Sequence, residues 1–312
     1  MPRGRRWVRL GVSAAALAAL LRFVPVRELM KALTHVSVDV LVSALVVLLI
    51  GHAVAAAKWR LLQGGNTGLS LALALRAHFC GVMANLWLPG VVGGDLVRAG
   101  MILSRTKRPT LVVLASLVDR IVDSLALLCL AGIGLALVGD SSPNARHLLM
   151  AGAGVTTVFA LLVLGGYRYV KARPVKPKFT QLMEAIDLMV QQPGRVGCAF
   201  LISIAVQTAF IIVNVNLGRA VGMAAPISAW FLAWPLAKIA ALVPISAAGL
   251  GIREAALVVL MRPFGDPSSA VMAAGLLWQA VFIFGGILGS CVFFLVPGGG
   301  RAAEIPAPSS GG

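Results

Sequence analysis

The sequence predicts an all-α, polytopic membrane protein made of two inverted repeats, each with about three transmembrane helices and one re-entrant helical hairpin. Three observations support this fold class. The 312 residues are 59% hydrophobic and only 12% charged, with a mean hydropathy of +0.93, which is too apolar for a soluble domain. Several apolar runs approach the ~20 residues that cross a bilayer. Finally, one short motif occurs in each half of the chain.

The apolar runs define the expected elements. Uninterrupted transmembrane spans are expected at Val8–Val26, Val38–Ala57, Leu111–Val138, His147–Tyr167, Val196–Leu217 and Ala270–Val296. Two further apolar stretches, Leu69–Gly100 and Ile227–Met261, are interrupted by Pro, Gly and charged residues. We expect residues 1–145 to form the first half of the membrane unit and residues 146–297 the second. A tail at residues 298–312, rich in Pro, Gly and Ser, is expected to be disordered.

The two interrupted stretches carry the matching motif. It is PGVVGGDLVR at Pro89–Arg98 and PISAAGLGIRE at Pro244–Glu254, and in both Gly follows Pro by five residues and Arg by nine. Helix breakers and charges are both costly inside a bilayer, so paired breaks in two halves indicate a transport site near the midplane. Chance agreement of three residues is the alternative.

The distribution of Lys and Arg predicts the orientation. With the N-terminus inside, the cytoplasmic segments hold 17 Lys and Arg residues and the outer segments hold 6, a clear positive-inside bias. We therefore expect a multi-pass protein of the inner (plasma) membrane with both termini in the cytoplasm. The net charge of +16 would suit nucleic acid, but the cations cluster at the ends of apolar runs, so no nucleic-acid partner is expected.

The same orientation predicts how the interrupted stretches run. Cations flank the first stretch on both sides, so a hairpin at about residues 69–100 should enter and return from the cytoplasm, and one at about 227–261 from the outside. The alternative treats each stretch as two full spans, giving ten in all. The shortness of the pieces favours hairpins.

With these motifs, the chain resembles the lysylphosphatidylglycerol synthase transmembrane-region family, also described as flippase-like membrane proteins. The resemblance covers about Ala44–Val296 and depends on three blocks in family order. They are Asn85-x-x-x-Pro89-x-x-x-Gly93-Gly94-Asp95-x-x-Arg98, Asp119-Arg120, and Pro244-Ile245-Ser246-x-x-Gly249-x-Gly251-x-Arg253-Glu254. It implies a membrane module that moves or handles polar lipids. Lipid-aminoacylating members carry a further soluble synthase domain. This sequence ends at Gly312, so the resemblance does not imply lysine transfer to lipid. Because the sequence also lacks a His/Asp/Glu cluster typical of hydrolysis or transfer, we do not expect an enzyme.

The candidate substrate-binding residues are the polar, charged and glycine residues of the three motif blocks, together with Lys238. They are Asn85, Gly93, Gly94, Asp95, Arg98, Asp119, Arg120, Lys238, Ser246, Gly249, Gly251, Arg253 and Glu254. A charged side chain at mid-bilayer costs ~2.5–3.5 kcal/mol on insertion scales. A functional role is therefore the default hypothesis for the charged residues of this set. The motif suits a phosphate group for three reasons. Its glycines open the backbone, the start of the following helix presents free N–H groups, and the Arg side chain offers a planar fork of donors.

Structural interpretations of the same residues stay open. Asp95 and Arg98, three residues apart, would neutralise each other on one helical face, and Asp119–Arg120 would be an anchor at a helix start. Asp123 shares a helix face with Asp119, and both would then hold the hairpin cations in place. Gly285-x-x-x-Gly289 suits close helix packing and does not require dimerisation.

Metal and cofactor signals are weak. The four cysteines are scattered singly, the four histidines form no ligand pair by spacing, and no nucleotide-binding motif is present. We expect no cofactor and no metal. The predicted function is a lipid translocator, in which two facing hairpins form a cavity for a polar or anionic head group of a phospholipid or glycolipid. The alternatives are an accessory subunit or enzyme that presents lipid to a separate lipid-modifying enzyme, and a structural scaffold.

Overall fold

The computed structural model describes residues 34, 36–86, 92–103, 105–106, 108–138, 150, 154, 187, 191–241 and 251–295. Among these residues there are helices, turns and no strand. The helices are α3 (Val38–Gln63), α4 (Leu71–Asn85), α5 (Val92–Leu103), α6 (Pro109–Val138), α9 (Pro193–Ala220), α10 (Ile227–Ala240), α11 (Ile252–Met261) and α12 (Ser268–Leu295), with 3₁₀ turns η1 (Gly64–Thr67) and η2 (Arg262–Phe264).

Four of these helices are long and apolar enough to cross a membrane. They are Val38–Gln63, Pro109–Val138, Pro193–Ala220 and Ser268–Cys291 within α12. Four of the six predicted spans are thereby confirmed, with starts and ends shifted by a few residues. The predicted span Val8–Val26 and the tail at residues 298–312 lie outside the described residues, as does nearly all of His147–Tyr167. An all-helical, multi-span membrane protein is therefore confirmed.

Both interrupted stretches consist of two short helices. The first stretch forms α4 and α5, of 15 and 12 residues, and the second forms α10 and α11, of 14 and 10 residues. At 1.5 Å per residue, none of the four reaches the ~30 Å of a bilayer core. The connecting residues 87–91 and 242–250 lie outside the described part of the chain, and they contain Pro89 and Pro244.

Local sequence features explain where the short helices begin. The Ser70 side chain caps α4 by accepting a hydrogen bond from the Leu73 amide at 3.2 Å. Helix α11 follows Gly251, whose φ of 87° is a conformation that favours glycine. The Gly251 amide donates to the Glu254 carboxylate at 2.9 Å. The acid of the second motif therefore stabilises the first turn of its own helix.

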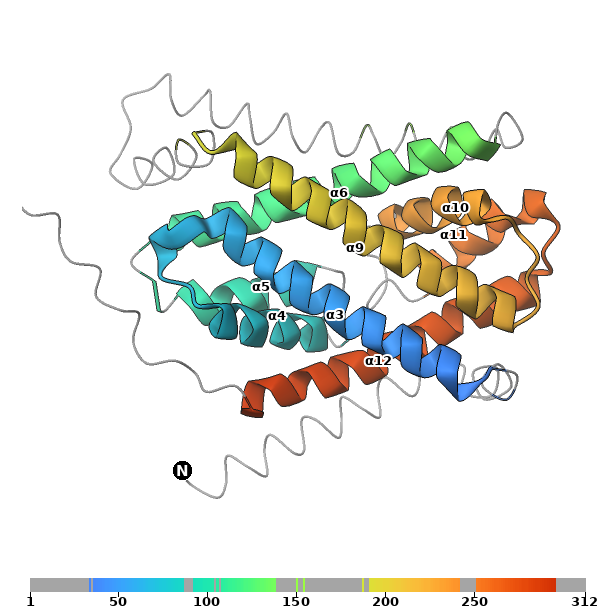
Figure 1. The fold of residues 1–312 in the computed structure, drawn as a ribbon, viewed down its shortest axis with the longest axis horizontal. Coiled ribbons are helices and arrows are strands. Elements are labelled where there is room, and N and C mark those ends of the chain that lie inside the picture. Colours follow the sequence, from blue (N-terminus) through green and yellow to red (C-terminus); the bar gives the residue numbers. More distant parts are fainter. Residues whose placement is uncertain are drawn as a thin grey trace, which may run out of the picture.

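The short helices lie at opposite ends of the molecule. In Figure 1, α4 and α5 lie together toward the left end of the long axis, and α10 and α11 lie together toward the right end. The long helices α3, α6, α9 and α12 run between these ends. Helix α6 packs along α10 and α9, α3 packs along α9, and α12 contacts both α4 and α11. The long helices therefore hold the two short pairs in one framework.

Small residues permit the close approach of these helices. A Cβ atom at Gly134 on α6 would meet the backbone of Phe231 and Leu232 on α10. On α12, a Cβ at Gly285 would meet Leu48 of α3, and one at Gly289 would meet Phe79 of α4. The Gly285-x-x-x-Gly289 pattern therefore serves packing within the chain, as expected.

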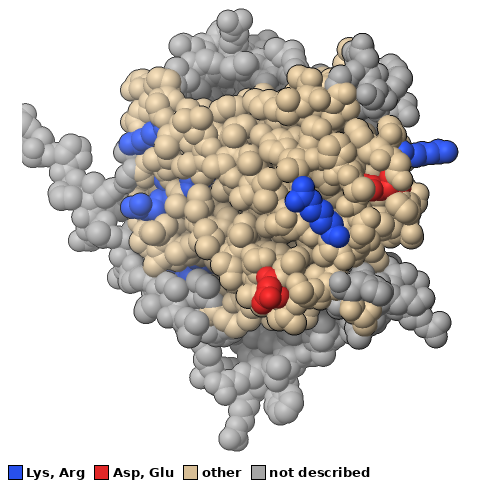
Figure 2. All heavy atoms as spheres, turned by 45° about the vertical axis from the view of Figure 1, so that its right-hand side comes forward, with Lys and Arg blue, Asp and Glu red and all other residues tan. Residues whose placement is uncertain are grey.

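The outer surface is apolar. On α3, Val38, Val42, Val46, Ile50 and Val54 are exposed at a spacing of four residues, which places them along one side of the helix. The opposite side contains the buried Ala44, Leu48 and Lys58. Figure 2 shows that Lys, Arg, Asp and Glu occupy little of the described surface on the face in view. Such a surface suits contact with lipid chains rather than water.

Candidate functional site

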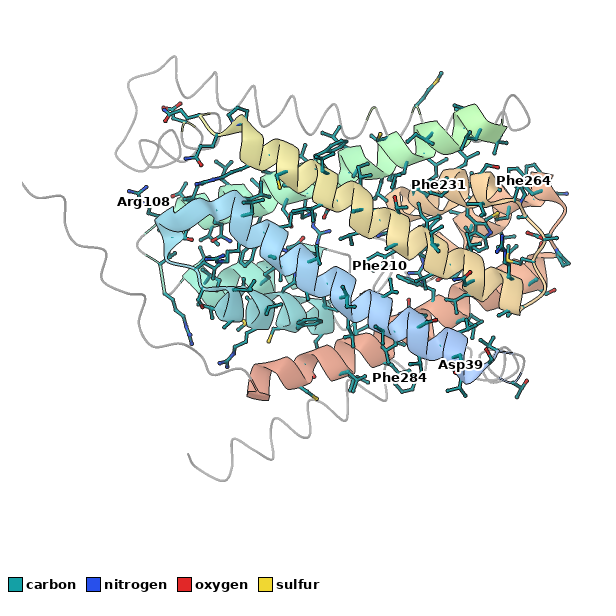
Figure 3. The ribbon with its side chains drawn as sticks, in the orientation of Figure 1. Asp39, Arg108, Phe210, Phe231, Phe264 and Phe284 are labelled. Carbon is teal, nitrogen blue, oxygen red and sulfur yellow. The ribbon has the colours of Figure 1, made fainter. Side chains whose placement is uncertain are left out.

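The principal cavity lies among the helices and is lined by residues of α3, α4, α5, α6, α9, α10, α11 and α12. Its volume is about 230 Å³. Phe210 of α9, which lines it, lies near the middle of the long axis, between Arg108 at one end and Phe264 at the other (Figure 3). We call this space the central cavity. Both pairs of short helices therefore contribute to its wall.

The central cavity collects most of the sequence-predicted residues. Asn85, Gly94, Asp95, Arg98, Asp119, Arg120, Lys238 and Arg253 line it. Glu254 is buried and pairs with Arg253, and Gly251 is at the start of the same helix. Gly93 is buried in α5. Ser246 and Gly249 lie outside the described residues. The structure thus brings residues of all three motif blocks together around one space.

Gly94 lies where α5 meets α4. Its amide donates to the Asn85 side chain at 2.7 Å. A Cβ at Gly94 would overlap Asn85 and the carbonyl oxygen of Gly81. The motif predicts free N–H groups here for an anion, but the Gly94 amide already has an acceptor in Asn85. The glycine is needed for close helix contact, and Asn85 supports the helix start.

Arg98 is held by carboxylates of the protein itself. It is only 3% exposed, and its Nη2 lies 3.0 Å from Asp119 Oδ2 and 3.3 Å from Asp95 Oδ1. Its guanidinium also lies 4.5 Å from the centre of the Trp59 ring. Asp95 additionally accepts two hydrogen bonds from Arg120, from Nε and from Nη2, the latter at 2.7 Å. Asp95 and Arg98 therefore do neutralise each other, as one interpretation of the sequence expected. The network of ion pairs also includes Asp119 and Arg120 on α6.

Asp119 and Arg120 lie well inside α6, since that helix begins at Pro109. The interpretation of this pair as an anchor at a helix start is therefore wrong. The expectation that Asp119 holds a hairpin cation agrees with its contact to Arg98. Asp123 instead contacts Lys58.

Lys58 is a site residue that the sequence analysis missed. It is 2% exposed, lies 2.9 Å from Asp119 Oδ1, and also pairs with Asp123. Its Nζ donates to Ser203 Oγ at 2.9 Å, and that hydroxyl donates to Asp123 at 2.7 Å. The charge count includes Lys58 among the 17 cytoplasmic cations, because it directly follows the apolar run Val38–Ala57. The signal that could have found it is its place inside α3, five residues before the helix ends.

The second motif forms a smaller cluster. Arg253 pairs with the buried Glu254 and donates from Nη2 to Gln279 Oε1 at 3.1 Å. Its guanidinium lies 5.5 Å from the centre of the Trp234 ring. Each motif therefore presents an Arg whose charge is balanced by a carboxylate and whose flat face is near a Trp.

Lys238 differs from these cations. Its Nζ donates to Gln207 Oε1 at 2.8 Å and lies 5.7 Å from the centre of the Phe210 ring. Within the described part of the chain, no carboxylate oxygen lies within 4.0 Å of Nζ. Around the cavity, Lys58, Arg98, Arg120, Lys238 and Arg253 face Asp95, Asp119, Asp123 and the adjoining Glu254. Among these described residues the excess is one positive charge, and Lys238 is the cation without a carboxylate partner.

Two histidines also meet in the cavity wall, a contact that their spacing did not predict. His52 Nδ1 of α3 lies 3.1 Å from His78 Nε2 of α4. His78 Nδ1 lies 3.4 Å from Arg98 Nη1. Among the described residues, no group of three or more His, Cys, Asp or Glu side chains is placed to hold a metal ion.

Comparison with known proteins gives one match. A family model described as the lysylphosphatidylglycerol synthase TM region matches residues 6–289. No curated protein and no solved structure matches the chain.

Proposed function

Because this chain belongs to the lysylphosphatidylglycerol synthase transmembrane-region family, we propose that it translocates a membrane lipid whose anionic head group occupies the central cavity. Membership supports a function connected with membrane lipids. The step from lipid handling to translocation is the proposal, and it assigns no chemical reaction to the chain.

The excess cation at Lys238 is the observation that carries this proposal. Lys238 is half-buried, and a cation withdrawn from water without a counter-charge is costly. A phosphate oxygen beside Nζ would supply the missing negative charge and a charge-assisted hydrogen bond. Gln207 keeps the ammonium in place through the 2.8 Å contact. Arg253, which also lines the cavity, has a planar fork suited to further phosphate oxygens.

The size of the cavity limits what enters it. Its volume of about 230 Å³ is below the ~300–1,000 Å³ typical of sites that enclose a drug-sized ligand. A head group fits such a space, whereas acyl chains do not. The exposed apolar side chains of the long helices offer those chains a continuous hydrocarbon environment outside the cavity.

The helix arrangement supports an inverted pair of re-entrant hairpins. Helices α4 and α5 approach the cavity from one end, and α10 and α11 from the other (Figure 1). Each helix is too short to span. In the proposal, each pair enters and returns on its own side of the membrane, and the two ends open the cavity alternately. The predicted halves at residues 1–145 and 146–297 are the two repeats.

The same proposal assigns the orientation. Arg60, Arg105 and Arg108 are exposed cations near the end of the molecule that holds α4 and α5. The opposite end holds the exposed Asp39, Arg219 and Arg262, and thus fewer cations. By the positive-inside rule, the first end faces the cytoplasm. We place the protein in the plasma membrane with both termini inside.

A vesicle assay with a matched pair of variants tests the proposal. The purified chain is reconstituted with trace fluorescent phosphatidylglycerol, and an impermeant reductant bleaches the probe on the outer leaflet. We expect Lys238→Gln to slow exchange between leaflets at least about tenfold, since a hydrogen bond to a charged group is worth about 1.5–3 kcal/mol. Arg105→Gln, an exposed cation outside the cavity, is the control and should leave the rate unchanged. Equal rates in wild type and Lys238→Gln would contradict the proposal.

A further inference from the structure

The His52–His78 pair has no role in the proposed function and no counter-charge of its own. Both rings line the central cavity, and their nitrogens are 3.1 Å apart. No carboxylate oxygen of the described residues lies within 4.0 Å of either ring. His52 is instead surrounded by Phe79, Phe210 and Phe282, with ring centres 6.3, 5.8 and 5.9 Å away. Among the described residues, no carboxylate therefore pairs directly with an added proton.

The hydrogen bonds define the protonation of the pair. A guanidinium has donors and no acceptor, so Arg98 Nη1 must donate to His78 Nδ1. His78 then carries its single proton on Nε2, which donates to His52 Nδ1. His52 in turn carries its proton on Nε2. Both imidazoles are neutral in this arrangement.

The same logic shows what an added proton does. If it binds His78 Nδ1, an N–H faces the N–H of Arg98. If the added proton binds His52 Nδ1, then His78 Nε2 must accept a hydrogen bond from it. The proton of His78 then moves to Nδ1, and an N–H again faces the N–H of Arg98. In either case the pair gains a proton only by losing the contact between His78 and Arg98. His78 belongs to α4 and Arg98 to α5, so the proton removes a contact between the two helices of the first short pair.

The charged neighbours determine when a proton is bound. The described residues that α9 and α12 add to the cavity wall are uncharged. The charged residues of this wall are Lys58 on α3, Asp95 and Arg98 on α5, Asp119, Arg120 and Asp123 on α6, Lys238 on α10 and Arg253 on α11. Their sum, with Glu254, is one positive charge, which opposes protonation of the empty site. A monoanionic head group in the cavity brings that sum to zero and so removes this opposition to protonation.

We infer that the His52–His78 pair is a proton-binding site coupled to the cavity anion, so that a proton and an anionic head group bind together. The inference rests on the proposed function only for the identity of the anion. His52 and Lys238 lie on the same Phe210 ring, 5.8 Å and 5.7 Å from its centre. A unit charge about 10 Å away at an effective dielectric constant of about 20 raises proton affinity at least about tenfold, or one pH unit. Coupling of this kind is reciprocal, so protonation tightens lipid binding by the same factor.

Nitrogen-15 NMR of histidine-labelled full chain in nanodiscs tests this without any transport measurement. His52→Gln and His78→Asn identify the two signals. In phosphatidylcholine alone, we expect neutral rings with protons on Nε2. With phosphatidylglycerol added, the midpoint of protonation of the pair should rise by about one pH unit or more. An unchanged midpoint would overturn the inference, as would a His78 proton on Nδ1 in phosphatidylcholine.

Lys238→Gln provides the control for surface potential, because an anionic membrane concentrates protons at every site. The lipid-dependent rise should disappear in Lys238→Gln, and an equal rise in both proteins would overturn the inference. In the vesicle assay, the double variant His52→Gln/His78→Asn keeps an oxygen acceptor for Arg98 but has no imidazole at the pair to titrate. Its translocation rate should stay constant from about pH 5 to 8, whereas the wild-type rate changes several-fold. If the Lys238→Gln vesicle test fails while the NMR shift persists, only the proposed translocation is lost.

Discussion

Arg98 on α5 and Asp119 on α6 form a buried ion pair, with Nη2 and Oδ2 3.0 Å apart and each side chain 4% exposed. The pair joins a short motif-bearing helix to a membrane-spanning helix. Arg98 therefore differs from the cation that the sequence suggested, which would face a head group directly. Its charge is already engaged inside the protein, and its first effect is on stability and on the position of α5.

Arg98→Ala should reduce stability by about 3–5 kcal/mol, because Asp119 and Asp95 lose a buried counter-charge. Thermal unfolding of the detergent-solubilised protein measures this. Arg98→Lys retains the charge but loses the forked geometry, so its loss should be smaller. The exposed Arg105→Ala serves as the control. Equal stability of Arg98→Ala and Arg105→Ala would contradict a structural role for the pair.

Lys58 and Asp123 should be energetically coupled. Lys58→Met leaves the buried Asp119 and the half-buried Asp123 without the ammonium they share, and the loss should be several kcal/mol. Adding Asp123→Asn to Lys58→Met should recover part of it. A double-mutant cycle on unfolding free energies measures the coupling, which we expect to exceed about 1 kcal/mol. Strict additivity would show that the contact contributes nothing.

Gly94→Ala should destabilise the contact between α4 and α5. The added Cβ overlaps Asn85 and the backbone of Gly81, and overpacking of this kind costs about 1–3 kcal/mol. Gly100→Ala is the matched control on the same helix, since a Cβ there meets nothing within 4 Å. Its replacement should be neutral or stabilise the helix by up to about 1 kcal/mol. If Gly94→Ala and Gly100→Ala unfold at the same temperature, the predicted role of Gly94 in the contact between α4 and α5 is wrong.

Labelling at the two ends of the molecule should distinguish the proposed orientation from its reverse. In a background without Cys80, Cys129, Cys198 and Cys291, a cysteine is introduced at Arg108 or at Arg262, both of which are exposed. An impermeant maleimide added to intact cells should label Arg262→Cys and spare Arg108→Cys until the membrane is permeabilised. The opposite pattern would show that the positive-inside count misassigns the orientation.

Several features were predictable from the sequence because they depend on local chemistry. Long apolar runs predicted α3, α6, α9 and α12, since a helix must span a bilayer of known thickness. Proline, glycine and charge in Leu69–Gly100 and Ile227–Met261 predicted interruptions, and each stretch is indeed two short helices. The motif blocks also predicted the family, which the match over residues 6–289 confirms.

Other features were not predictable because they depend on contacts between distant helices. Lys58 was counted as a cytoplasmic cation, yet the packing of α3 against α6 buries it beside Asp119 and Asp123. His52 and His78 are 26 residues apart, and only the approach of α3 to α4 makes them a pair. No spacing rule relates such positions.

By itself, the sequence determined the solvent of this protein, its helical class and the places where its membrane helices break, because these follow from the cost of exposing apolar or polar groups to the wrong medium. Only the tertiary structure decided which charges are neutralised and which is left over. That outcome depends on distances of 2.9 and 3.0 Å between side chains of different helices, a range in which Coulomb and hydrogen-bond energies change steeply. Arg98 and Lys238 look alike in the sequence, and the fold pairs the first with carboxylates and leaves the second facing the cavity.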